Sequence, residues 1–162
     1  MTDVEKQIKD TVKNGGVLAM LYFDIHAKSK ELVQELGTGF INNMIQKQGV
    51  VMALGEIDEP VGGEEGKNWS SCISLKILTR DFKALSAICM AHSPFTIEIL
   101  RPDEIVLPLN EAHDLLGTMS ATTAEYKRYI LTKLAKPGEM ASIEENLMQR
   151  AKMGKKILGD KK

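Results

Sequence analysis

The spacing of apolar and polar residues divides the first hundred positions into short, separate segments. Val4, Ile8 and Val12 recur at helical spacing in a charged stretch that ends at Asn14-Gly15-Gly16, which predicts a short leading helix. The run VLAMLYFDI, residues 17–25, is apolar almost throughout, and its length favours a strand buried on both faces. Residues 50–57 predict a second strand.

Two later segments alternate between apolar and polar residues, which predicts strands with one buried and one exposed face. These segments are residues 71–78, with Ile73, Leu75 and Ile77 on the buried face, and residues 95–100, with Phe95, Ile97 and Ile99 inward.

Helical spacing occupies the interval between the first and second strands, the interval between the third and fourth, and the C-terminal third. Ser29 and Thr79 are predicted N-caps of two helices, and Ser93-Pro94 ends the second one. A long apolar stripe from Leu115 to Leu134 predicts a long helix, and Ser142 with Glu145 predicts a capping box for a last one. Between them, residues 104–109 fit a short added strand or an extended link.

The order strand, helix, strand, strand, helix, strand over residues 16–101 resembles the ferredoxin-like superfold, on which ACT-type regulatory modules are also built. The resemblance rests on element order and implies a βαββαβ antiparallel sheet with the first and third strands central. The turn where ACT modules hold an amino-acid ligand contains a glycine, whereas the turn here reads DIHAKS. We expect an α+β domain with its leading helix over residues 1–109, and over 110–162 a helical extension that packs on the sheet or on a partner subunit.

Charge and length exclude several classes of protein. In 162 residues, 21 Lys and Arg balance 22 Asp and Glu, so no global field attracts polyanions, and nucleic acid is an unlikely partner. The N-terminus is charged, and no apolar run reaches the ~20 residues that cross a bilayer. Cys72 and Cys89 lie in apolar segments without metal-ligand spacing. We expect a soluble cytoplasmic protein with reduced thiols and without a cofactor, a metal or a membrane partner.

The loop VGGEEGKNWSS, residues 61–71, superficially suggests a phosphate cradle. A Walker loop needs four residues between its glycines and a hydroxyl after the lysine, but here three residues separate Gly62 from Gly66, and Asn68 replaces the hydroxyl. The loop also leads into a strand instead of a helix. We interpret it as a long strand connection in which Trp69 packs.

The predicted sheet has an outer face, opposite the crossover helices, that gathers polar side chains. Parity places Met20, Tyr22, Asp24, Ser74, Lys76, Thr96 and Glu98 there. Tyr22, Asp24, Lys76 and Glu98 are the candidate ligand-binding residues, because Tyr22, Lys76 and Glu98 could orient a small polar ligand. Alternatively, Lys76 forms an ordinary cross-strand ion pair with Glu98 or Asp24.

The histidines offer a weaker signal. Asp24 and His26 share a strand face and could supply two metal ligands, but no third ligand is evident. His92 falls at a helix C-terminus, where the dipole favours a protonated ring, and His113 is unrelated to either. No Ser/His/Asp or Cys/His arrangement with a recognisable local motif is present, which leaves three unconnected histidines as the simplest interpretation.

These patterns predict a non-enzymatic binding or interaction module that self-associates, most simply as a dimer. The outer face of the first strand and the long C-terminal stripe carry apolar residues that need cover from the chain itself, a second copy, a protein partner or a ligand. The alternative is a small-molecule sensor or enzyme that uses Tyr22, Lys76 and Glu98. A third hypothesis is RNA binding through the basic end, Lys152, Lys155, Lys156, Lys161 and Lys162.

Overall fold

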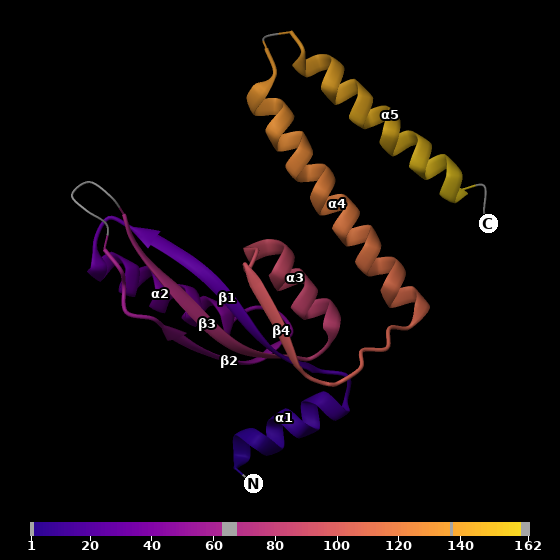
Figure 1. Ribbon diagram of the computed structural model, residues 1–162. Helices are drawn as coiled ribbons and strands as arrows, with labels where there is room; N and C mark the ends of the chain where they lie inside the picture. The colour runs from indigo at the N-terminus through magenta and orange to yellow at the C-terminus, as the bar shows by residue number, and fades with distance from the viewer. Residues whose placement is uncertain (1, 63–67, 137, 160–162) are drawn as a thin grey trace. The chain divides into compact units, whose positions relative to one another are not determined.

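The computed structural model describes residues 2–62, 68–136 and 138–159 and has an α+β fold, as predicted (Figure 1). The helices are α1 (Asp3–Lys13), α2 (Lys30–Met44), α3 (Phe82–His92), α4 (Leu109–Leu134) and α5 (Met140–Gly159). The strands are β1 (Val17–Ala27), β2 (Val50–Ile57), β3 (Trp69–Thr79) and β4 (Thr96–Arg101). The chain divides into two compact units, Met1–Leu115 and Leu116–Lys162.

The strands form one sheet in the order β2-β3-β1-β4, with every neighbouring pair antiparallel. The first and third strands are therefore central, as predicted, and β2 and β4 are the two edges (Figure 1). Leu21 of β1 lies between Leu75 of β3 and Ile97 of β4, and this register sets the rows of side chains across both faces.

The main core lies between the sheet and helices α2 and α3. Alternate residues of β1 and β3 meet apolar residues from both helices, because strand side chains on one face recur with a period of two. The buried members are Val17, Ala19, Leu21, Phe23, Met44, Ile73, Leu75, Ile77, Leu85 and Ile88. The predicted buried face of residues 71–78 is confirmed.

Helix α1 covers one end of the opposite, outer face. Its Ile8 and Val12 pack on a second cluster of Leu18, Met52 and Leu78. Both faces of β1 are thus buried only at its start, and the prediction of two buried faces is wrong farther along, where Asp24 is exposed. The reason is that α1 is too short to cover the whole strand, since a helix of three turns spans only part of an eleven-residue strand.

Two glycines let α2 and β2 approach closely. A Cβ atom on Gly37 of α2 would lie 2.7 Å from Ile57 Cδ1, and one on Gly55 of β2 would lie 2.5 Å from Ile41 Cδ1. An isoleucine of β2 therefore packs against the glycine of α2, and an isoleucine of α2 packs against the glycine of β2. We call these two contacts the reciprocal glycine sockets.

Several predicted element ends need correction. Ser29 caps α2 by accepting from the Leu32 N–H at 3.2 Å, as predicted. Thr79, however, is the buried last residue of β3, and Asp81 caps α3 by accepting from the Ala84 N–H at 2.7 Å. Ser142 lies inside α5, which begins two residues earlier. Residues 102–108 form an extended link and no strand.

The alternation of residues 95–100 predicted that one face of this strand is buried. The structure shows that it is exposed. Ile97 and Ile99 do share the face that bears α2 and α3, but both are exposed. Phe95 precedes β4, is also exposed, and has its ring 6.4 Å from that of Tyr22, measured between centroids, beside the outer face. β4 is at the margin of the sheet, beyond the close packing of α3 on the central strands. Among the described residues, no helix combines the length and apolarity that a bilayer crossing requires.

Candidate functional site

The outer face of the sheet consists of rows of side chains that run across the strands. In one row Tyr22 lies between Ser74 of β3 and Thr96 of β4. In the next row Met20 lies between Lys76 and Glu98. The register therefore brings the predicted face together as parity suggested, with Tyr22 and Met20 half-buried at its centre.

Lys76 and Glu98 are on opposite sides of β1. Two strand spacings, about 10 Å, separate their backbones, and no ion pair joins them in the described part of the chain. Lys76 instead faces Met20 and Leu54, so the cross-strand ion pair weighed above is not formed. Both charged groups are exposed and point to the same solvent layer, on either side of an apolar centre.

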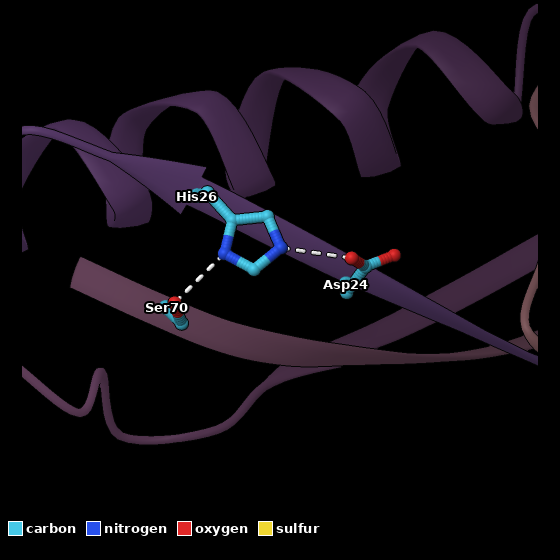
Figure 2. A network of polar contacts seen from close by, with 3 residues as sticks. All are labelled: Asp24, His26 and Ser70. Carbon is cyan, nitrogen blue, oxygen red and sulfur yellow. Dashed lines mark hydrogen bonds and ion pairs between the residues drawn. The ribbon is translucent and has the colours of Figure 1, made fainter. Parts of the chain in front are cut away.

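A chain of three polar side chains lies at the far end of the same face (Figure 2). The ring of His26 bridges Asp24 on its own strand and Ser70 on β3, which is its direct partner in the register. His26 Nε2 is 2.8 Å from Asp24 Oδ2, and Nδ1 is 2.7 Å from Ser70 Oγ. Ser70 is held in place because its backbone exchanges two hydrogen bonds with Val61, at 2.8 and 3.0 Å.

The protonation of this chain follows from its donors and acceptors. The hydrogen bond from His26 lowers the pKa of the Asp24 carboxyl below its usual value of 3.8, so the group is ionised and can only accept. Nε2 therefore carries the shared hydrogen. In the neutral ring Nδ1 is then an acceptor, and the Ser70 hydroxyl can donate a hydrogen bond to it.

This connectivity is that of a nucleophile, a base and an orienting acid. Its environment is open, however, because the side chains of His26 and Asp24 are 52% and 65% exposed. Water screens the interaction as it does in any surface pair. The arrangement can therefore bind a polar group or relay a proton, and it holds the Ser70 oxygen at a fixed position.

Cys72 lies on the same face, directly opposite Asp24. Burial raises the pKa of its thiol, and the carboxylates of Asp58 and Asp24 raise it further. Burial also raises the pKa of Cys89. Both cysteines are free, and neither is in an environment that favours the reactive thiolate.

The other two histidines are separate from this site. The helix dipole predicted a protonated His92, but burial lowers the pKa of its ring, and the nearby Lys47 cation lowers it further. The ring packs edge-on against Phe40, at 5.6 Å between centroids. His113 is exposed on α4. The described residues contain no cluster of three or more metal-ligating side chains.

Sequence reasoning identified Asp24 and His26 but missed Ser70, and with it the Ser/His/Asp arrangement. No local motif could reveal it, since Ser70 and His26 are 44 positions apart. Parity does put Ser70 on the outer face, and a correct β1–β3 register is the one signal that would have joined the three residues.

The loop that suggested a phosphate cradle is described only at its ends. Val61 bridges to Ser70, and a Cβ on Gly62 would lie 2.6 Å from the Trp69 ring, which agrees with a packing role for Trp69. Residues 63–67, which include Glu64, Glu65 and Gly66, lie outside the described residues, as do Lys161 and Lys162 of the basic end.

Comparison with known proteins places the chain in a family. The model of the MJ0538 family matches residues 18–146. The chain belongs to the MJ0538 family. The family match runs from the start of β1 into α5 and includes the whole outer face described above. No curated protein and no solved structure matches this member of the MJ0538 family.

Proposed function

We propose that this MJ0538-family chain is a non-enzymatic interaction module that self-associates, with a ferredoxin-like sheet and a helical hairpin whose apolar surface a second copy covers. The connectivity β1-α2-β2-β3-α3-β4 and the strand order β2-β3-β1-β4 support the ferredoxin-like assignment. The free thiols of Cys72 and Cys89 support a cytoplasmic location.

The observation that carries this proposal is the surface of the C-terminal helices. Over their described lengths α4 and α5 contain no buried residue. Their exposed large apolar side chains are Leu109, Leu116, Met119, Tyr126, Tyr129, Ile130, Leu131, Leu134, Met148, Met153, Ile157 and Leu158. Most helical stability in proteins comes from packing an apolar face, so helices of 26 and 20 residues with this surface require cover.

The charges of α5 favour a second copy as that cover. The first half of the helix carries Glu144 and Glu145, and the second half carries Arg150, Lys152, Lys155 and Lys156. Two α5 helices that pack antiparallel would bring each acidic half against a basic half. The net charge of −1 adds little repulsion between copies.

Sedimentation equilibrium of the full chain tests this proposal. We expect a mass twice that of the 17.9 kDa chain at micromolar concentration. Ile130→Glu should shift the protein toward monomer, whereas Ser120→Glu, a matched charge on the same helix, should leave the mass unchanged. A wild-type protein that is monomeric throughout the micromolar range would contradict self-association.

A second candidate function is a small-ligand sensor or enzyme that uses the outer face, and the Asp24–His26–Ser70 chain favours it. Tyr22, Lys76 and Glu98 would contact the ligand beside this chain. Thermal unfolding across amino acids, nucleotides, divalent metals and metabolites should reveal a stabilising ligand, whose effect Lys76→Ala weakens and Lys9→Ala, on α1, does not. This candidate is lost if Lys76→Ala and Glu98→Ala leave every response unchanged.

A further inference from the structure

The free side of β4 combines an unpaired strand edge with an apolar surface. β4 is the last strand of the sheet, and within the described residues only β1 pairs with it. Phe95, Ile97 and Ile99 are 60%, 48% and 41% exposed. Natural edge strands are usually protected by lysine, proline or a bulge. In β4 these features lie at the ends, with Pro94 and Pro102 on either side and an irregularity at Leu100, and residues 95–99 contain none of them.

The strand is complementary to itself in one register. In an antiparallel pair about a two-fold axis, partners share a face, so the axis passes through a residue. An axis at Ile97 places Ile97 against its own copy, and it places Ile99 at the register position of Phe95, which immediately precedes β4 in the other copy. On the opposite face it places Glu98 against Thr96, so no two carboxylates meet.

The neighbouring registers are worse for identifiable reasons. An axis at Glu98 sets two carboxylates directly opposite each other, which is destabilising. An axis at Ile99 sets Ile97 against Arg101 and Thr96 against Pro102, which lacks an N–H. That register also crosses the irregularity at Leu100, the residue skipped where the β1 register shifts between Leu18 and Ala19.

We propose that β4 pairs antiparallel with β4 of a second copy about an axis at Ile97, which joins two four-stranded sheets into one. This pairing rests on the self-association proposed above and adds a contact through the sheet to the one proposed for α4 and α5. The main chain supplies hydrogen bonds across the axis, and the two Ile97 side chains cover each other, with Ile99 beside them on the same face.

Disulfide trapping tests the pairing in the full chain, with Cys72→Ser and Cys89→Ala as the background. Directly opposed residues have Cα atoms about 4.5–5.5 Å apart, which a disulfide can span. Ile97→Cys should therefore form a covalent dimer under mild oxidation with diamide. Ile99→Cys is the matched control, because its two copies would be about four residues, or roughly 13 Å, apart along the strands.

A second pair of variants uses exposed positions and avoids the apolar surface. Thr96→Cys and Glu98→Cys chains, mixed before oxidation, should give the mixed disulfide as the main product, identified by intact mass. Circular dichroism of the reduced proteins confirms that each variant is folded.

The outcomes separate this pairing from self-association as such. Trapping at position 97 but not at 99 supports it, and the reverse result overturns the axis. A wild-type dimer that neither variant pair traps overturns the pairing of β4 and leaves self-association in place. A wild-type monomer overturns both proposals, and slow alkylation of Ile97→Cys in that monomer would show that the chain's own residues cover the strand.

Discussion

The two edges of the sheet differ in how they are covered. On β2, Val50, Ala53 and Ile57 pack against the main core, and Met52 is 9% exposed in the outer cluster beneath α1. On β4, the apolar face has comparable composition but remains open to solvent. The apolar side chains of an edge strand are thus covered where two helices reach them and open to solvent where they do not. An edge strand's role depends on its neighbours in the fold more than on its own sequence.

The largest expected effect is on stability, and it should differ between the edges. Met52→Ala removes a buried side chain and should lower the free energy of unfolding by about 2–5 kcal/mol. Ile97→Ala removes a half-exposed one and should lower it by about 1 kcal/mol. Urea denaturation at low protein concentration measures both. Equal losses would mean that β4 is as well covered as β2.

Dimer formation should be more sensitive to substitutions on β4 than on β2, which is the opposite of what we expect for stability. Ile97→Lys places two like charges at the proposed axis and should raise the dimer dissociation constant by about 100-fold, or ~2.7 kcal/mol. Leu54→Lys introduces the same charge at an exposed position of β2, and the dimer should be unaffected. Sedimentation velocity over a dilution series compares them. A stronger effect of Leu54→Lys would assign the interface to β2.

A smaller effect concerns His92, at the end of the helix that precedes β4. Burial lowers the pKa of its ring, so the unfolded chain takes up this proton more readily than the folded chain does. The folded state should therefore lose stability as the pH falls below about 6.5, the usual histidine value. His92→Gln should flatten that part of the curve of unfolding free energy against pH. An unchanged slope would show that His92 is not the responsible group.

The smallest expected effect is on the pKa of Asp24, on the outer face of the sheet. Its pKa, lowered by the hydrogen bond from His26, should rise toward 3.8 in His26→Ala. Carbon-detected NMR titration of the carboxyl group measures this directly. Ser70→Ala leaves the Asp24–His26 bond in place and serves as the control, so a large change there would contradict the described geometry.

The sequence contains the element order and the division of faces, because both follow from local periodicity. Tyr22, Lys76 and Glu98 were placed on one face for that reason. Local periodicity could not predict the contact of His26 with Ser70. These residues are 44 positions apart, and the register that brings them together depends on the whole sheet. The exposure of Ile97 was also unpredictable, since alternation identifies a face but not the reach of the helices above it.

The reciprocal glycine sockets have a consequence for how the molecule opens. They join α2 to β2, two elements that adjoin in the chain, so this contact can form and re-form without a long loop closing. β4, by contrast, is held on one side by a strand far from it in sequence. We therefore expect the amides of β4 in an isolated copy to exchange hydrogen in the first sub-global opening, and those of β2 in a later one.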